Sequence, residues 1–547
     1  MLADLGSSAP LYPALSQPWY TGMVRVRVIL GCGIVGLLLL GGCHSDGARR
    51  LDGGPDVARW VDAGSDAAAP ADGAEVATPS LCSFPDPVLA EAVIEASRAQ
   101  GGAPENHILD VTTKQVRSLT GIDCLAELEW LTVDASQLTD FSPLAGHPTL
   151  TRLTIRNSKV TDFSPFLAIP NLDSLEIDGL FADLSLLAQA AKLERLTVYS
   201  PNLRQLAGLG LAPHLVALDV GKSPLDSFEG IAGAPALSRI SAQAAKSAAG
   251  IHDVPALSTL ELSHSPIVDL AGIERTPALS TLDADDTSIV SFRGLKEQPN
   301  LKYLRAVGSQ LASLDGIGAA PNVSELSVTS TPLTSLQGVE ILTQLATLYI
   351  AQTNVASLEP LAGLPRLSDL YMSQTKVSDL RPLASSPSLQ TLELADTPVA
   401  DLAPLHGMPN LSELGLRGTP VSNLGPLAGM ASLEKLVIEG TQVTDLSPLA
   451  GLPMLTGLHA NKTQVTSLAG LVGLSKLRWL NVDDGALVSL GTIELLSPAI
   501  LSIMRDPLDA EALATIARLC QAGWVVSWDG GNCGDICKID INYCVDF

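Results

Sequence analysis

A leucine pattern that returns every 22 residues constrains this chain more than any other feature. In one clear copy the apolar positions are Leu367, Leu370, Met372, Val377, Leu380 and Leu383, and the spacing begins again at 389, 411 and 433. With the first apolar position as the marker, seventeen units begin at residues 128, 150, 172, 193, 215, 237, 257, 279, 301, 323, 345, 367, 389, 411, 433, 455 and 477. From 257 onward the period is an unbroken 22 residues. A period this regular predicts one stacked repeat architecture and not a series of unrelated domains.

The spacing inside one unit predicts a short strand followed by a return segment. Side chains at relative positions 3 and 5 point to the same side of an extended chain, and successive strands should stack ~4.8 Å apart as a parallel sheet. Prolines restrict the return segment to turns or short helices, at Pro382, Pro404, Pro426 and Pro448. Hydrophobic residues make up 46% of the chain and aromatic residues only 4%, so the core must be built mainly from aliphatic side chains. No unit can bury its apolar side alone, so each depends on its neighbours.

Threonines recur where each strand should end, and we expect their hydroxyl groups to turn inward and bond to backbone groups. This structural role explains them better than catalysis does. They are Thr331, Thr353, Thr375, Thr397, Thr419, Thr441 and Thr463.

Over residues 82 to 500 the pattern resembles the 22-residue leucine-rich repeats of the internalin type. The resemblance implies an α/β repeat solenoid: a leucine-rich-repeat arc with a parallel β-sheet on the concave face, short 3-10 or turn segments on the convex face, a helical N-terminal cap and a Cys-rich C-terminal cap. Phe84 to Val93 looks like the helical cap of that family, with Asp86 as N-cap and Pro87 at the first helical position. Leu89, Val93 and Ala96 would form its apolar stripe, and Val116, Leu119 and Ile122 the latter half of a capping repeat.

A helix beginning at Asp506-Pro507 should close the other end of the stack. Its apolar positions are Leu508, Leu513, Ile516 and Leu519, and Gly523 should end it before a strand over 524–528. The predicted organisation is a signal region over 1–43, a tether over 44–80, an N-terminal cap over 81–127, the seventeen repeats over 128–500, and a C-terminal cap with a Cys-rich tail over 501–547.

The N-terminal 43 residues resemble a bacterial lipoprotein signal. A basic stretch over 23–27 precedes an apolar run over 28–40, and small residues lead to Cys43. The resemblance implies cleavage before Cys43 and a lipid on its thiol, with Met23 as the true start of translation. An uncleaved membrane anchor is the alternative, although the apolar run is shorter than the ~20 residues that span a bilayer. The residue that follows Cys43 is His44 and not an aspartate. By the usual sorting rule of bacteria with two membranes, this favours the outer membrane or the cell surface.

The segment 44–80 is rich in Ala, Asp, Gly and Pro, and it has too few large apolar residues to form a core. We therefore expect a flexible tether. Between 172 and 256 the repeat spacing shortens to 21 and 20 residues, and the stretch 241–250 is mostly Ala and Ser. We expect a local bend or a looser repeat there, which reflects either sequence drift or a specialised binding element.

The cysteines favour an oxidising compartment. Apart from Cys32 and Cys43, they lie only in the two predicted caps: Cys82, Cys124, Cys520, Cys533, Cys537 and Cys544. We expect Cys82 to pair with Cys124 and two further disulfides among the last four, whose three possible pairings stay open. A zinc site is the alternative for these four residues.

The sequence lacks the residues that several classes of function require. The formal net charge of −25, with 33 scattered Lys and Arg, speaks against nucleic acid as a partner. The sequence contains no His-Glu-x-x-His pair, phosphate-binding glycine loop or Gly-x-Ser-x-Gly elbow, so we expect no enzyme, no cofactor and no metal site. Asp540 to Asn542 only faintly resembles a calcium loop, and His264 and His459 could face the concave surface singly.

One cluster stands out among the positions that should point into the concave face. It combines tyrosines with charged residues: Tyr303, Arg305, Glu325, Tyr349, Asp369 and Tyr371. Tyr349 and Tyr371 share a column in adjacent repeats and should stack. Tyrosine and arginine are enriched at interface hot spots, although tyrosine also favours strands for packing alone. Trp130 and Trp479 hold equivalent columns near the two ends, where contacts with the caps explain them.

These observations favour a monomeric, exported lipoprotein of the cell envelope that binds a protein or glycan ligand through its concave face. The alternative is an envelope scaffold with no extracellular ligand. The host-invasion role of some internalins does not transfer, because surface residues and not the repeats decide the partner.

Overall fold

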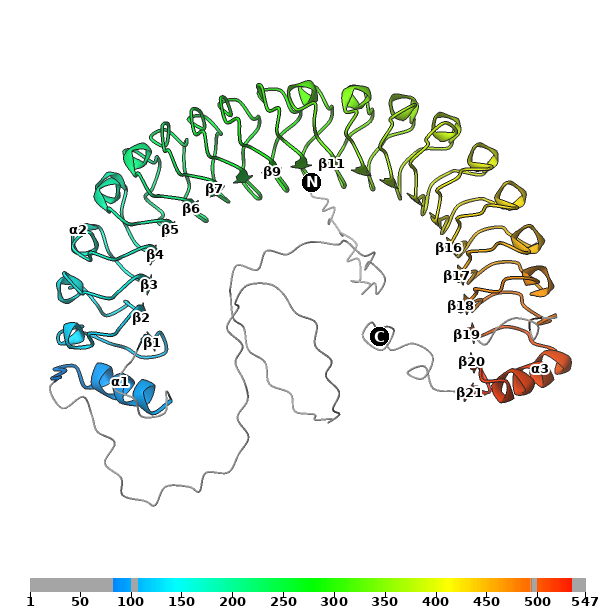
Figure 1. The fold of residues 1–547 in the computed structure, drawn as a ribbon, viewed down its shortest axis with the longest axis horizontal. Coiled ribbons are helices and arrows are strands. Elements are labelled where there is room, and N and C mark those ends of the chain that lie inside the picture. The colour runs from blue at the N-terminus through cyan, green and yellow to red at the C-terminus, as the bar shows by residue number, and fades with distance from the viewer. Residues whose placement is uncertain (1–81, 100–106, 492, 494–498, 534–547) are drawn as a thin grey trace, which may run out of the picture. The chain divides into compact units, whose positions relative to one another are not determined.

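The computed structural model describes residues 82–99, 107–491, 493 and 499–533, and these belong to one compact unit that begins at residue 75. The predicted signal region, Cys43 and the tether therefore lie outside the described residues. Figure 1 shows the described repeats arranged as an arc with the strands along its inner side.

Twenty-one strands of the described chain form a single sheet. The strands are β1 (Ile108–Val111), β2 (Trp130–Asp134), β3 (Arg152–Arg156), β4 (Ser174–Asp178), β5 (Arg195–Tyr199), β6 (Ala217–Asp219), β7 (Arg239–Ser241), β8 (Thr259–Glu261), β9 (Thr281–Asp283), β10 (Tyr303–Arg305), β11 (Glu325–Ser327), β12 (Thr347–Tyr349), β13 (Asp369–Tyr371), β14 (Thr391–Glu393), β15 (Glu413–Gly415), β16 (Lys435–Val437), β17 (Gly457–His459), β18 (Trp479–Asn481), β19 (Ile500–Ile503), β20 (Val525–Trp528) and β21 (Gly531–Cys533). Each strand pairs in parallel with the next, except that β20 and β21 are antiparallel.

The strands β2 to β18 begin two residues after each of the seventeen predicted repeat markers. The solenoid fold predicted from the sequence is therefore confirmed. In the three-residue strands β6 to β18 the central leucine or isoleucine is buried, as Leu348 and Leu370 are at 0% exposure, because the core lies between the sheet and the return segments. The flanking side chains face the concave side.

Short 3-10 helices occupy the convex side, as the prolines predicted. They are η1 (Ile122–Cys124), η2 (Ser142–Leu144), η3 (Ser185–Gln189), η4 (Leu209–Leu211), η5 (Ile317–Ala319), η6 (Val339–Ile341), η7 (Glu359–Leu361), η8 (Arg381–Leu383), η9 (Ala403–Leu405), η10 (Gly425–Leu427), η11 (Ser447–Leu449) and η12 (Ala469–Leu471), with the short α2 (Ser164–Leu167) in the same layer. Between η4 and η5, where every residue is described, the return segments contain no 3-10 helix.

The repeats over 172–256 keep their strand pairing, so the looser repeat that was one of the two expectations is not found. Their strands keep continuous parallel pairing from β4 to β8. Ala242, Ala245 and Ala248 are fully buried, so small side chains fill a return segment that is two residues shorter than usual. The shortened repeats thus preserve the core by reducing side-chain volume.

Helices close both ends of the described sheet. At the N-terminal end, α1 (Pro87–Ala99) packs beside β1, and the Asp86 carboxylate caps it by accepting the Val88 N–H at 2.8 Å. At the C-terminal end, α3 (Ala510–Gln521) begins with Asp509 as its N-cap, three residues after the predicted Asp506. Leu513 is 48% exposed and was wrongly assigned to the core, whereas Ile516 and Leu519 are buried.

Candidate binding surface on the concave face

The parallel register lines up side chains from different repeats into columns on the concave face. Each short strand there contributes two outward positions, one on either side of its buried leucine. Tyr303, Glu325 and Asp369 occupy the first position, and Arg305, Tyr349 and Tyr371 the second, in strands β10 to β13. The structure thus brings the six predicted residues onto four adjacent strands.

Tyr349 and Tyr371 form a parallel aromatic stack. Their ring centroids lie 4.7 Å apart with an interplanar angle of 9°. The backbone register places these residues directly opposite each other, and stacking over that spacing covers one face of each ring. The pair is half-buried, so it presents a rigid and partly apolar platform on the concave surface.

Carboxylates surround this tyrosine stack. Burial raises the pKa of Tyr371 to about 12, and Tyr349 and Asp369 add to the shift. Burial also raises the pKa of Tyr349, together with the charges of Glu325 and Asp369. Both phenols are therefore neutral across the physiological range, in a locally negative potential.

Arg305, expected to be a ligand contact, is already engaged within the molecule. Its guanidinium Nη2 lies 2.6 Å from the Asp285 carboxylate, and its Nε lies 3.9 Å from Asp283. Burial raises the pKa of Asp285 while the hydrogen bond from Arg305 lowers it. Arg305 therefore neutralises a half-buried acid. It lies in the same column as Tyr349, two strands earlier in the sheet.

An amide ladder borders the same strands where they end. The Ser330 hydroxyl donates to Gln352 Oε1 at 2.5 Å, and Gln352 Nε2 donates to Gln374 Oε1 at 3.1 Å. All three residues have a positive φ, near 60°, which holds them at the exposed strand exits. They supply polar groups along one edge of the tyrosine stack.

Sequence reasoning missed a further tyrosine on the concave face. Tyr199, in β5, lies over Gly221, and a Cβ at that glycine would collide with the ring. Burial raises the pKa of Tyr199 to about 12, with Asp219 and Glu176 contributing. The glycine at the same position of the next repeat was the signal that could have revealed this arrangement.

The remaining aromatic and histidine candidates lie toward the ends or the edge of the sheet. The Arg152 guanidinium carbon lies 5.8 Å from the centroid of the Trp130 ring, and the rings of His459 and Trp479 are 5.7 Å apart. Burial lowers the pKa of His459. His264 is exposed and pairs with Asp286 at 3.3 Å. These residues contact their neighbours within the protein and lie apart from the tyrosine stack, so they are not part of the candidate surface.

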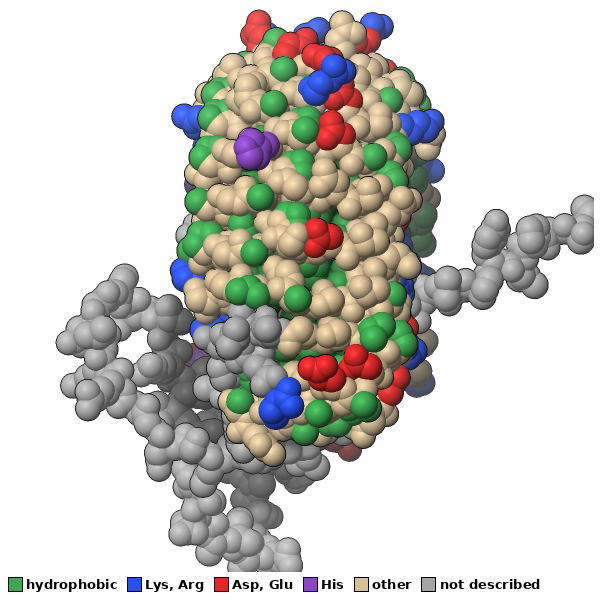
Figure 2. All heavy atoms as spheres, turned by 90° about the vertical axis from the view of Figure 1, so that its right-hand side faces the viewer, with side chains coloured by type: hydrophobic (Ala, Val, Ile, Leu, Met, Phe, Trp, Pro, Cys, Tyr) green, Lys and Arg blue, Asp and Glu red, His purple; other side chains and the backbone are tan. Residues whose placement is uncertain are grey.

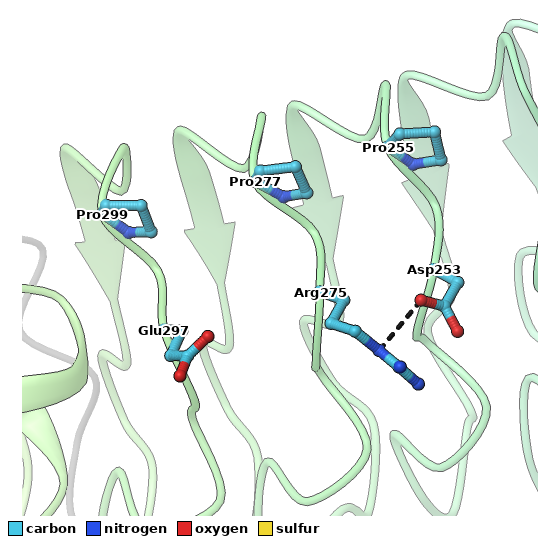
Figure 3. A pocket seen from close by; sticks show the side chains of 6 residues that line it. All are labelled: Asp253, Pro255, Arg275, Pro277, Glu297 and Pro299. Atoms are coloured by element: carbon cyan, nitrogen blue, oxygen red, sulfur yellow. Dashed lines mark ion pairs between the residues drawn. The ribbon is translucent and has the colours of Figure 1, made fainter.

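A groove of about 510 Å³ lies on the flank of the solenoid, away from the strands' concave side (Figure 3). Prolines line one side of it and charged residues the other: Asp253, Pro255, Arg275, Pro277, Glu297 and Pro299. Asp253, Arg275 and Glu297 have positive φ at a position where other repeats carry glycine. Arg275 Nε pairs with Asp253 at 2.9 Å, and Lys296 pairs with Glu274 at 2.5 Å nearby. Most of these charges therefore pair with one another across adjacent repeats, in the described stretch between η4 and η5 that has no 3-10 helix.

The limb of the arc that contains η10 to η12 offers no comparable cluster in the view from that side. Figure 2 shows this face, and where described residues form the surface the acidic and basic side chains are scattered singly or in small groups. The concave tyrosine stack is therefore the more distinctive candidate.

Disulfides tie down both caps. Cys82 is bonded to Cys124 with a Cα–Cα distance of 5.6 Å, and Cys520 to Cys533 with a Cα–Cα distance of 5.8 Å. The sequence had suggested the first pair and left the second open. Cys537, Cys544 and the segment 540–542 lie outside the described residues. Among the described residues, no cluster of three or more His, Cys, Asp or Glu could hold a metal ion, and no helix could span a membrane.

This geometry defines a leucine-rich-repeat solenoid that presents a curved parallel sheet. No protein-family model matches the sequence, and the comparison with curated proteins gave no match. Among solved structures, internalin C2 of Listeria monocytogenes shares 30% identity over 33% of this chain and 80% of its own, with a TM-score of 0.31. A leucine-rich-repeat protein of Leptospira interrogans shares 16% identity over 81% of this chain and 98% of its own, with a TM-score of 0.48.

The Drosophila Toll–Spatzle complex includes a chain that matches with a TM-score of 0.53. That match has 15% identity and covers 75% of this chain and 58% of the other. The likeness is one of fold.

Proposed function

We propose that this protein is an exported, monomeric lipoprotein, anchored through Cys43 in the outer membrane or at the cell surface, which recognises a protein partner through its concave face. The stacked pair Tyr349 and Tyr371 carries this proposal. A half-buried aromatic platform on a rigid sheet is the kind of anchor that dominates interface energies. The absence of enzyme motifs from the sequence favours binding over catalysis.

Two further observations support a protein partner. The solved Toll–Spatzle structure is a complex that contains a solenoid of this fold. The repeats and the two cap disulfides give this chain a rigid framework, which lowers the entropy lost on binding. The lipobox resemblance at Cys43 supports export and anchoring.

A pull-down from cell-envelope extract and from the culture medium tests this function. The full-length protein is compared with Tyr349→Ala/Tyr371→Ala, and with Tyr199→Ala as a control on the same face. We expect at least one protein retained by the wild type and by the control to be lost from the double variant. Retention of the same proteins by all three would place binding elsewhere on the molecule. Retention of a glycan and of no protein would mean that the ligand is a glycan and not a protein.

Protease shaving of intact cells tests the location. Cleavage of the protein on intact cells is the expected result, because a surface-exposed solenoid is open to the protease. Full protection, with cleavage only after the outer membrane is permeabilised, would support a periplasmic scaffold.

A further inference from the structure

The charge pattern around the tyrosine stack is unbalanced. Glu325 lies one strand before Tyr349, in β11, and within the described part of the chain its side chain forms no hydrogen bond or ion pair. Asp369, in β13 beside Tyr371, accepts only the Ser368 hydroxyl at 2.6 Å and pairs with no cation among the described residues. Two carboxylates thus flank the stack without a cation in ion-pair contact in the part of the chain that the structure describes. The positive charge of Arg305 acts on Glu325, but Arg305 is itself paired with Asp285.

Several carboxylates in other repeats of the concave face are neutralised instead. Asp285 pairs with Arg305 at 2.6 Å, Glu413 with Lys435 at 2.7 Å, and Glu439 with Lys462 at 3.0 Å. These ion pairs lie on both sides of Glu325 and Asp369 along the sheet. Glu325 and Asp369, which have no such ion pair within the described chain, lie directly beside the aromatic platform.

A third carboxylate beside the stack has a structural role. Glu393 is placed next to Tyr371 by the strand register and accepts the Ala395 backbone N–H at 3.2 Å. Its carboxylate covers Gly415, where a Cβ would collide with it. Glu393 is thus packed onto the sheet, which leaves Glu325 and Asp369 as the acids that can meet a ligand.

We propose that this surface binds a basic segment of the protein partner, with an arginine or lysine side chain held against the tyrosine stack and paired with Glu325 or Asp369. The inference rests on the proposed function and names the chemistry of its partner. Cations are attracted to the negative faces of tyrosine rings, and arginine can also pair with a carboxylate through two hydrogen bonds. The net charge of −25 attracts a basic partner at long range and repels an acidic one.

Binding of a defined peptide to the full-length protein tests this proposal. The probe is a fluorescein-labelled peptide of about ten residues that alternates arginine and serine, and a glutamate version is the negative control. Fluorescence anisotropy gives the Kd for the wild type, for Tyr349→Ala/Tyr371→Ala and for Glu325→Gln/Asp369→Asn. Circular dichroism checks that each variant is folded.

The matched control for charge is Glu229→Gln/Glu359→Gln. These exposed acids occupy equivalent positions on the convex side of their repeats, and their replacement changes the net charge by the same amount. We expect the Kd to rise about tenfold for each concave variant and less than about twofold for this control. Raising the salt concentration should weaken wild-type binding more than binding to the concave acid variant.

Equal losses in the concave and convex acid variants would show diffuse attraction by net charge and would overturn the proposal. So would binding that does not depend on the tyrosines.

The experiments distinguish failure of the proposed function from failure of this inference. A protein partner that depends on the tyrosines but is not displaced by the arginine peptide leaves the proposed function standing and refutes the basic segment. Peptide binding that depends on the tyrosines, without any protein partner in the pull-down, would support the basic-segment chemistry and count against the proposed function.

Discussion

The inward threonine column shows how single hydroxyl groups stabilise the strand exits. Thr331, Thr353, Thr397, Thr419, Thr441 and Thr463 are buried, and each donates to the backbone carbonyl three residues earlier at 2.7 Å. This is the role that the sequence suggested. Thr375 is the exception, because its buried hydroxyl has no hydrogen-bond partner. One column therefore holds both a set of bonded hydroxyls and an unbonded reference.

Replacing threonine by valine in this column should separate the hydrogen bond from the packing. Thr397→Val removes the bond to the Leu394 carbonyl and should lower the free energy of unfolding by about 1 kcal/mol. Thr375→Val replaces an unpaired buried hydroxyl and should be neutral or stabilising. Urea unfolding followed by circular dichroism measures both. Equal destabilisation by the two variants would mean that the hydroxyl bonds contribute little to stability.

At the scale of elements, Asp506 joins the last repeats to the C-terminal cap. It lies between β19 and α3, and its Oδ1 accepts the Leu487 N–H at 3.0 Å. Burial raises its pKa to about 6, and the nearby charges of Asp483 and Asp484 add to this shift against the opposing effect of the backbone hydrogen bonds. A raised pKa means that the folded state disfavours the charged carboxylate, so this group costs stability as the pH rises from about 4 through 6.

Asp506→Asn should therefore stabilise the protein at pH 8 and have little effect at pH 4. The asparagine keeps the Oδ1 acceptor and removes the charge. Thermal unfolding at several pH values, compared with the wild type, measures the difference, and Glu511→Gln, an exposed acid on α3, is the control. A variant that is less stable than the wild type at pH 8 would show that the carboxylate is needed in its charged form.

The elements also differ in how far sequence reasoning could place them. A fixed spacing of buried leucines predicts every strand from β2 to β18, since the period specifies which side chains face inward. The start of α3 was misplaced because Asp506 and Asp509 are both suitable caps, and only the packed structure selects one. The pairing of Arg305 with Asp285 could not be predicted, because it depends on the directions of long side chains from adjacent repeats. The tyrosine stack was predictable since register alone brings its two rings together.

The whole solenoid is a one-dimensional stack in which each repeat contacts mainly its neighbours. Stability should therefore depend on where along the arc a layer is weakened. Leu370 in β13 and Leu501 in β19 are both buried leucines, at 0% and 1% exposure, and replacing either by alanine should cost about 2 to 5 kcal/mol locally. The middle of the arc has many strands on both sides, whereas among the described strands β19 is followed by β20 and β21 alone.

Hydrogen exchange followed by mass spectrometry should reveal this difference. In Leu501→Ala, faster exchange should be confined to the strands nearest the C-terminal cap, because the rest of the stack keeps its intact neighbours. In Leu370→Ala, exchange should increase on both sides of β13 and reach the tyrosine stack. A uniform increase along the chain in both variants would show that the repeats unfold as one cooperative unit, in which case mutations far from the concave face would also weaken ligand binding.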